Sequence, residues 1–96
     1  MAEATLSIQI IPVVPEEQIY PLVDQAIAMI SASGFTYWIG PSETTIEGDL
    51  TSMLELVQKL LRSTYGAGAS RIISHIKIDY KPSGVTIDEK IHKYLK

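Results

Sequence analysis

The chain has 96 residues, of which 46% are hydrophobic and 20% charged, and its formal net charge is -3. This length suits one domain, and the composition is that of an ordinary folded globule, not of a disordered or fibrous chain. The lack of cysteine excludes disulfide bonds, thiol catalysis and cysteine-ligated metals, and the negative charge disfavours a nucleic acid as partner.

The N-terminal stretch MAEATLSIQIIPVV differs from a secretory signal peptide. It carries an acid, Glu3, where a signal peptide is basic, and Pro12 interrupts its apolar run. No segment of the sequence approaches the roughly 20 apolar residues of a membrane span. We therefore expect a cytoplasmic protein with no membrane partner.

The first third of the chain predicts a strand followed by a helix. Apolar and polar residues alternate from Thr5 to Ile11, as in a strand with one buried face. Prolines end this strand, Glu16 and Glu17 open a helix at its positive end, and Gly34 is a candidate C-cap. Spacings of three and four define the expected buried face of the helix: Ile19, Val23, Ala26, Ile27 and Ile30.

The rest of the chain predicts two short strands, a helix, a long strand and a helical tail. The turn residues Gly40, Pro41 and Ser42 separate the strands Phe35–Ile39 and Thr44–Gly48. A helix then begins near Asp49 or Thr51, with an expected apolar face of Met53, Leu54, Val57, Leu60 and Leu61, and it ends at the glycines of YGAGAS. Alternation returns from Arg71 to Tyr80, and the capping-box spacing of Thr86 and Glu89 predicts a short helix over 87–96.

This order of elements predicts an α+β fold, the ferredoxin-like plait (βαββαβ), as a single domain over residues 1–96. Such a plait has a four-stranded antiparallel sheet with both long helices on one face. Its first and third strands lie side by side in the centre. We call the other face of the sheet the open face.

Strand parity predicts which side chains the open face carries. If Ile46 points towards the helices, Thr45 and Glu47 point away from them, because successive side chains alternate. The same rule adds Ser7 and Gln9 from the first strand, and from the last strand Ile73, His75, Lys77 and Asp79. Trp38 joins this face if Tyr37 and Ile39 point inward. These residues form a candidate binding site for one small molecule.

Two plainer interpretations stand beside the binding site. An antiparallel sheet with one face in water also alternates in this way, and Glu47 and Lys77 would then form only a weak cross-strand ion pair. Alternatively, Ile11, Ile73 and Trp38 indicate that the open face packs on another subunit. Under that interpretation the chain is a structural or regulatory interaction domain without a ligand.

Catalytic and metal-binding patterns are not found in the sequence. His75 and His92 are too isolated to predict a metal site, and YGAGAS follows a helix, the reverse of a phosphate-binding loop. The third strand, ETTIEGD, lacks the aromatic and basic residues of an RNA-recognition module. The loop PVVPEEQ lacks the arginine of an acylphosphatase-type enzyme. With no activated nucleophile or acid–base pair, a binding protein is favoured over an enzyme.

Three segments together resemble the small thiamine-binding protein family, the YkoF-like proteins. They are SIQIIPV, YWIGPSETTIEGD and HIKIDYKPSGVTIDEKIHKYL, and the resemblance covers nearly the whole chain in order. Its most specific parts are the hairpin GPS-TT-EG and the tail IDYK-G-TI-EK. Trp38 departs from the pattern, because the family is expected to have a polar residue at this position.

The resemblance implies a ferredoxin-like fold and assembly into a homodimer or homotetramer. It also implies binding of thiamine or its hydroxymethylpyrimidine moiety without turnover, with no further cofactor. The candidate ligand-binding residues from parity suit this ligand, because an aminopyrimidine edge needs carboxylate, hydroxyl and amide partners and an aromatic ring can stack on it. They are Ser7, Gln9, Trp38, Thr45, Glu47, His75 and Lys77, with Tyr37 as the alternative to Trp38 for the stacking ring.

Overall fold

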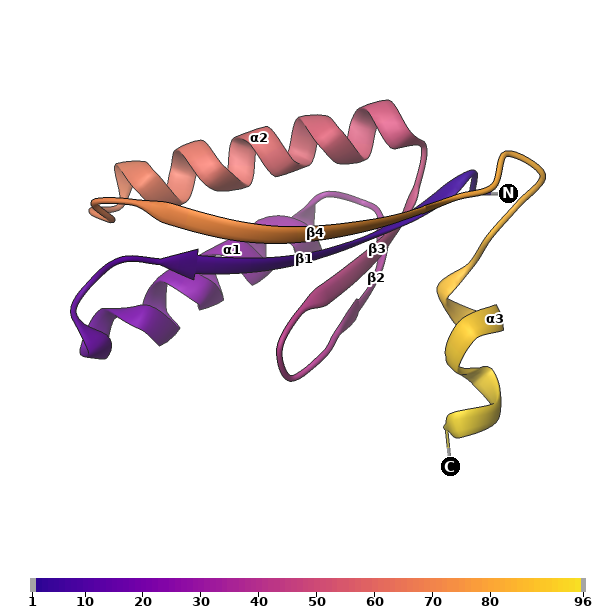
Figure 1. The fold of residues 1–96 in the computed structure, drawn as a ribbon, viewed down its shortest axis with the longest axis horizontal. Coiled ribbons are helices and arrows are strands. Elements are labelled where there is room, and N and C mark those ends of the chain that lie inside the picture. The colour runs from indigo at the N-terminus through magenta and orange to yellow at the C-terminus, as the bar shows by residue number, and fades with distance from the viewer. Residues whose placement is uncertain (1, 96) are drawn as a thin grey trace.

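The computed structural model describes residues 2–95 and confirms the α+β plait (Figure 1). Two 3₁₀ turns, η1 (Glu16–Gln18) and η2 (His92–Tyr94), accompany the regular elements. The strands and helices are β1 (Ala4–Pro12), α1 (Ile19–Ala32), β2 (Thr36–Ile39), β3 (Thr44–Gly48), α2 (Leu50–Gly66), β4 (Ile72–Tyr80) and α3 (Ile87–Ile91).

The four strands form one antiparallel sheet in the order β2-β3-β1-β4, so β1 and β3 are central as predicted. Leu6 on β1 lies opposite Ile46 on β3 and Ile78 on β4. These side chains point towards α1 and α2, which cover the same face of the sheet. The predicted parity of β1, β3 and β4 is therefore confirmed.

The core lies between the sheet and the two long helices. The largest fully buried side chains are Leu6, Ile46, Met53 and Leu60, which come from two strands and α2. Burying each such side chain contributes about 1.5–3 kcal/mol relative to leaving it in water. The strand face and the helix face thus meet through their apolar residues.

The expected apolar face of α2 is wrong at one position. Leu54 is 38% exposed, whereas Leu56 is 7% exposed and belongs to the core. Leu56 follows Met53 by three residues and therefore lies on the same side of the helix, while Leu54 is turned about 100° from Met53. Met53, Val57 and Leu60 are buried, and Leu61 packs partly buried against the core.

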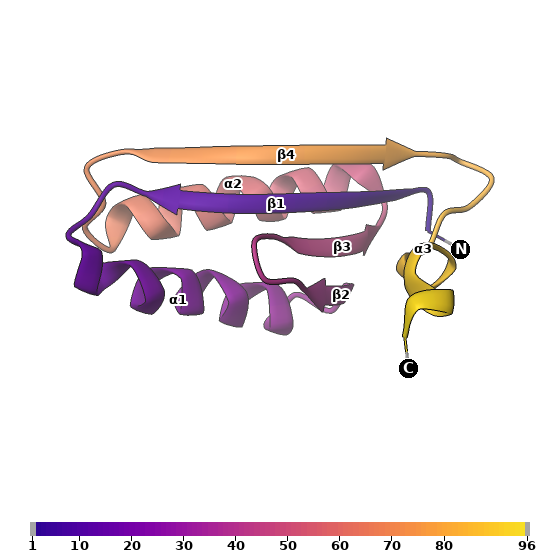
Figure 2. The same ribbon diagram turned by 60° about the horizontal axis from the view of Figure 1, so that its bottom comes forward.

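The buried face of α1 is also shifted from the prediction. Leu22, Ala26 and Ile30 are buried, but Ile19, Val23 and Ile27 are only half-buried. The reason is the short β2–β3 hairpin, which does not extend as far along α1 as β1 does (Figure 2). One flank of α1 therefore has no strand above it.

Element ends differ from the sequence prediction by a few residues. Ser33 is the C-cap of α1, and Gly34 follows it with a φ of 88°, a conformation that suits glycine. The tail helix is shorter than predicted: α3 ends at Ile91 and becomes a 3₁₀ turn, and Lys96 lies outside the described residues. Only Ile87 of α3 is buried, so little apolar contact is available to extend the helix.

Within residues 2–95 no helix combines the length and the apolar character that a membrane crossing requires.

Asp49 is the N-cap residue of α2. The Asp49 carboxylate accepts a hydrogen bond from the Ser52 backbone N–H at 2.9 Å, and this bond, aided by the Ser52 side chain, holds the pKa of Asp49 below its ordinary value. A lowered pKa in the folded state stabilises the fold above the ordinary pKa of aspartate. This stabilisation is lost as the pH falls through the folded-state value.

We therefore predict that Asp49→Asn lowers the melting temperature at pH 7 and has a progressively smaller effect as the pH falls below about 4. Thermal denaturation from pH 2 to 7 measures this difference. Asp24→Asn, which changes an exposed carboxylate on α1, is the matched control. A difference between Asp49→Asn and the unsubstituted protein that is constant across this range would contradict the capping role.

Candidate functional site

The strand register builds two adjacent rows of side chains on the open face. One row, which we call the tryptophan row, crosses the sheet through Trp38, Thr45, Ser7 and Lys77. The next, the carboxylate row, crosses it through Thr36, Glu47, Thr5 and Asp79. The two rows are two residues apart along each strand, a separation of about 7 Å, so one small molecule can contact both rows.

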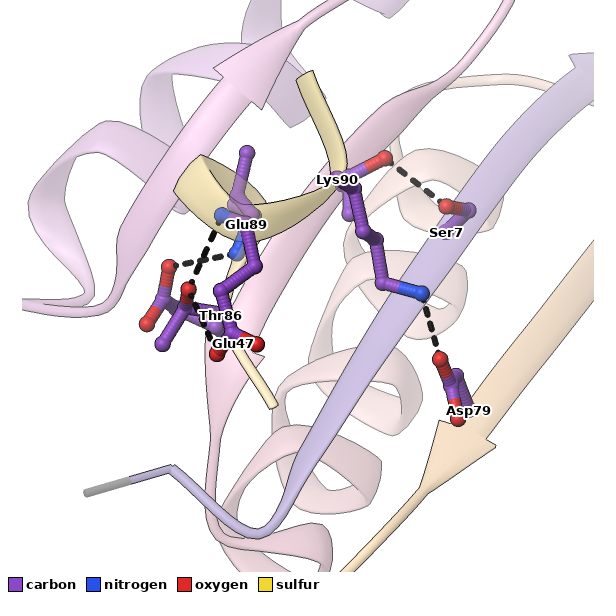
Figure 3. A network of polar contacts seen from close by, with 8 residues as sticks. Ser7, Glu47, Asp79, Thr86, Glu89 and Lys90 are labelled. Atoms are coloured by element: carbon purple, nitrogen blue, oxygen red, sulfur yellow. Dashed lines mark hydrogen bonds and ion pairs between the residues drawn. The ribbon is translucent and has the colours of Figure 1, made fainter. Parts of the chain in front are cut away.

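The short helix α3 lies against these rows and borders a half-open cavity of about 260 Å³. Figure 3 shows α3 on one side of the strands and α2 behind them, so the sheet separates the cavity from the core. We call it the α3 cavity. Its walls come from both rows, from α3 and from Ile78, which lies between Lys77 and Asp79 on the edge strand β4: Thr5, Ser7, Trp38, Thr45, Lys77, Ile78, Asp79, Ile87, Lys90 and Ile91.

Two carboxylates of the carboxylate row attach α3 to the sheet. The Ile87 backbone N–H, at the start of α3, donates to Glu47 Oε1 at 3.1 Å. The Lys90 ammonium group reaches across to Asp79 on β4 and forms an ion pair with it (Figure 3). The Thr86 hydroxyl caps the helix by accepting from the Glu89 N–H at 3.1 Å, which confirms the predicted capping position. The position of α3 therefore depends on charged side chains, of which Asp79 and Lys90 also line the cavity.

The floor of the cavity presents hydroxyl groups. The Ser7 and Thr45 hydroxyls are 2.7 Å apart and hydrogen-bond each other. Thr5 is only 4% exposed, and the hydrogen bonds found among residues 2–95 do not include its hydroxyl. Every side-chain oxygen of these residues that is inaccessible to solvent has a hydrogen-bond partner. Because the Thr5 hydroxyl has no partner, it is accessible to solvent, and it opens onto the cavity that Thr5 lines. A hydroxyl that has no protein partner and is accessible from a cavity suits hydrogen bonding to a ligand.

Trp38 forms an aromatic wall of the cavity. It lies at the edge of the sheet, is 46% exposed, and lines the cavity together with the apolar side chains of Ile87 and Ile91. The site therefore combines an aromatic face, apolar contacts, three hydroxyls and charged groups. Such a combination suits a flat, polar-edged ring better than a purely apolar ligand.

The structure brings together only some of the predicted site residues. Ser7, Trp38, Thr45 and Lys77 all line the α3 cavity, whereas Glu47 is not among its lining residues and instead accepts the Ile87 N–H of α3. Gln9 and His75 lie one row further along the open face, in a separate shallow hollow that also contains Glu43. Tyr37 lies opposite Ile46 and so belongs to the helix-covered face. A ligand-binding role for each of these residues stays a prediction.

The alternative pairing of Glu47 with Lys77 is wrong. Lys77 forms an ion pair with Glu43 at 2.9 Å, while Glu47 accepts the bond from α3. The reason is the register: Lys77 lies in the tryptophan row and Glu47 lies in the carboxylate row, on a strand that is not adjacent to β4. Glu43 stands in the turn before β3, within reach of the long lysine side chain.

Sequence reasoning missed six residues of the site: Thr5, Ile78, Asp79, Ile87, Lys90 and Ile91. Parity alone could have found Thr5, and it did place Asp79 on the open face without assigning it to the site. The three residues of α3 carried no signal, because nothing local shows that the tail folds over the sheet.

No cluster of three or more histidine, aspartate or glutamate side chains in the described part of the chain, residues 2–95, is arranged to hold a metal ion.

Comparison with known proteins adds to this geometry. Residues 6–95 match the family described as thiamine-binding protein. A UPF0045 protein of Clostridium perfringens is 44% identical over 94 residues, which cover 98% of this chain and 99% of that protein.

Two solved structures share the fold closely. A candidate thiamine biosynthesis or salvage protein of Thermotoga maritima is 38% identical with a TM-score of 0.90, covering 96% of this chain and 98% of that one. A domain of unknown function, DUF77, from Bacillus cereus is 41% identical with a TM-score of 0.89, covering 97% of this chain and 90% of that one. The match over nearly its whole length shows that this chain belongs to the thiamine-binding protein family.

Proposed function

We propose that the chain binds thiamine or its hydroxymethylpyrimidine moiety in the α3 cavity, without chemical turnover, as a carrier or sensor in the cytoplasm. The observation that carries this proposal is Thr5, a residue only 4% exposed whose hydroxyl has no hydrogen-bond partner among the described residues and lines the cavity together with Trp38, between the carboxylates of Glu47 and Asp79 in its row. Membership of the thiamine-binding protein family supports the same ligand class.

The chemistry of the cavity matches an aminopyrimidine. The exocyclic amino group is a donor, and carboxylate or hydroxyl oxygens of Glu47, Asp79 and Thr5 can accept from it. The ring nitrogens are acceptors, and the Ser7–Thr45 hydroxyl pair retains a hydrogen to donate to them. The Trp38 ring offers a face on which the pyrimidine can stack.

The dimensions and charge of the site suit a ligand with a cationic extension. A volume of about 260 Å³ accommodates a substituted pyrimidine ring, and because the cavity is open on one side, the thiazolium ring of thiamine can extend along the open face. Three carboxylates, of Glu43, Glu47 and Asp79, border this region against two ammonium groups, of Lys77 and Lys90. The local excess of negative charge and the Trp38 ring both favour a cation.

Binding without turnover is favoured by the state of the hydroxyls. A catalytic serine or threonine needs an adjacent base to activate it. The Ser7 hydroxyl is instead hydrogen-bonded to another hydroxyl, that of Thr45.

We further propose that the chain forms homo-oligomers through β4. This edge strand is nine residues long, and its Ile73, Ile76 and Ile78 side chains are exposed. The Lys81 N–H bonds the Glu3 carbonyl and the Val13 N–H bonds the Arg71 carbonyl, so odd-numbered residues of β4 bond β1. The even-numbered residues therefore direct their backbone groups outward, where β4 of a second copy can pair with them as a dimer. Contact between open faces, through residues such as Ile11 and Ile73, would give a tetramer.

The same exposed apolar residues favour the second candidate function, an oligomeric interaction domain without a small-molecule ligand. A stable oligomer that binds none of the pyrimidines tested below would favour this alternative.

Thr5→Val should weaken binding of both thiamine and hydroxymethylpyrimidine about tenfold, because it removes one hydroxyl partner while preserving shape. Isothermal titration calorimetry with each ligand measures this loss, and a ligand-dependent rise of the melting temperature gives an independent check. Thr36→Val, an exposed position at the edge of the same row, is the matched control. The proposal fails if neither ligand gives heat or a thermal shift at millimolar concentration.

Glu47→Gln should separate the two ligands. Glutamine keeps an acceptor for the Ile87 N–H but loses the charge, so thiamine affinity should fall about fivefold, an effect of about 1 kcal/mol, with a smaller change for the neutral pyrimidine. Glu47→Ala should weaken both ligands, because it also frees α3. Calorimetric titration at low and high salt tests the charge effect, with Glu55→Gln on α2 as control. If Glu47→Gln lowers the affinity for both ligands equally, the charge of Glu47 does not contribute to recognition of thiamine.

Ile76→Lys should convert the oligomer to a monomer, because a lysine on an edge strand opposes strand pairing between copies. Ile73→Lys, on the open face, should stop a tetramer at the dimer. Size-exclusion chromatography with light scattering measures both masses. An unchanged mass in both variants would show that neither β4 nor the open face is the contact.

A further inference from the structure

A second cavity lies beyond the turn of the β2–β3 hairpin, where β1 has no neighbouring strand on the β3 side. Pairing between β1 and β3 ends at Ile8 and Thr44, but β1 continues to Pro12. Figure 2 shows β1 and α1 extending together past the short β2–β3 hairpin. A cavity of about 320 Å³ occupies this region, and its walls come from β1, from α1 and from the turn over 40–43. We call it the hairpin cavity.

One wall of the hairpin cavity is a free strand edge. Val13 exchanges hydrogen bonds with Ser70 and Arg71, at 3.2 and 2.8 Å, so odd-numbered residues of β1 direct their backbone groups towards β4. Backbone groups alternate between the two neighbours of an antiparallel strand. Ile10 therefore directs its N–H and C=O to the side on which β3 has already ended, and Ile10 lines the cavity.

The turn of the hairpin does not occupy this edge, because its backbone bonds within itself. The Gly40 N–H donates to the Glu43 carbonyl at 2.8 Å and closes the turn. A Cβ atom at position 40 would lie 2.8 Å from the same carbonyl oxygen, so the tight shape depends on glycine. The hairpin therefore stays short and leaves the edge of β1 open.

A buried hydroxyl faces the same space. Thr44 is 6% exposed and lines the hairpin cavity, and the hydrogen bonds found among residues 2–95 do not include its hydroxyl. Every side-chain oxygen of these residues that is inaccessible to solvent has a hydrogen-bond partner. Because the Thr44 hydroxyl has no partner, it is accessible to solvent and opens onto the cavity. Thr44 in the hairpin cavity therefore resembles Thr5 in the α3 cavity: each is a largely buried threonine whose hydroxyl has no protein partner and opens onto the cavity.

The remaining walls are mostly apolar. They include the half-buried flank of α1 that lacks a strand above it, formed by Ile19, Val23 and Ile27. Glu43 also borders the cavity, but its charge is paired with Lys77 at 2.9 Å. The cavity thus offers apolar walls, one backbone donor beside one backbone acceptor at Ile10, and the hydroxyl-bearing residues Tyr20, Ser42 and Thr44, with no unpaired charge among its lining residues.

We propose that the hairpin cavity is a second ligand site, which takes a flat, uncharged heteroaromatic ring with adjacent hydrogen-bond donor and acceptor groups. The polar edge of the ring pairs with the Ile10 backbone as a neighbouring strand would, and its faces pack against the α1 flank. The Thr44 hydroxyl bonds a second polar atom of the ring. This site goes beyond the proposed thiamine function and is separate from the α3 cavity, since the two share no lining residue.

The probe for this site is 2-pyridone, a neutral ring with a donor and an acceptor side by side. Its N-methyl derivative, which lacks the donor, is the matched control ligand. In ¹H–¹⁵N NMR titrations of the full chain, 2-pyridone should shift the amide signals of Ile10 and Thr44. The N-methyl derivative should bind at least tenfold more weakly.

Variants distinguish the two cavities. Thr44→Val should weaken 2-pyridone about fivefold, whereas Thr5→Val should leave its affinity unchanged. Val23→Trp should fill the cavity and abolish binding, and Ile27→Phe serves the same purpose if the larger residue unfolds the chain. Equal binding of the two pyridones would overturn the proposal, as would shifts centred on Thr5 and Ile91 or unaltered binding in Thr44→Val. Loss of thiamine binding in Thr5→Val with 2-pyridone binding retained would support two independent sites.

Discussion

The pairing of β1 with β3 is the constraint on which the rest of the structure depends. Once Leu6 lies opposite Ile46, both side chains are buried against the helices, and their neighbours Ser7 and Thr45 must meet on the opposite face. A shift of one residue would reverse every side chain and expose the core, so the apolar residues that stabilise the fold also position the hydroxyls of the site. The stability of the fold and the geometry of the α3 cavity therefore rest on one register.

The α3 helix converts part of an exposed sheet face into a half-open cavity. A helix of five residues has little stability of its own, and it is held by Glu47, by Asp79 and by the burial of Ile87. The two carboxylates lie on either side of Thr5 in the sheet. The carboxylates that hold α3 in place would also attract a bound cation. The position of α3 would therefore depend on whether the cavity is occupied.

The short hairpin has the opposite effect on the other half of the molecule. It leaves the α1 flank and the edge of β1 without a covering strand. The flank has apolar side chains and the edge has free backbone groups, which are the features that a covering strand would contact. The two cavities therefore arise from two different departures from a complete plait: an added element over the sheet and a missing length of strand within it. Both place a buried threonine hydroxyl, Thr5 or Thr44, against open space.

The sequence by itself determined the plait, the order of its strands and the face on which each strand residue lies. These features follow from local periodicity: alternation defines strand faces, and the turn and capping residues mark the ends of elements. Prediction was less accurate for Leu54 and Leu56, because neighbouring leucines both suit a helix and only packing decides which is buried. It also misjudged the α1 flank, whose burial depends on the length of a hairpin elsewhere in the chain.

Only the tertiary structure decided how the open face is used. The partners of Glu47, Lys77 and Asp79 depend on where the tail and the hairpin turn lie in space, and no local pattern encodes that placement. The same holds for the α3 cavity, whose roof is separated from its floor by most of the chain, and for the hairpin cavity, which exists because two paired strands differ in length. Periodicity reports the environment on each side of a strand, whereas contacts between distant segments are determined by how those segments pack.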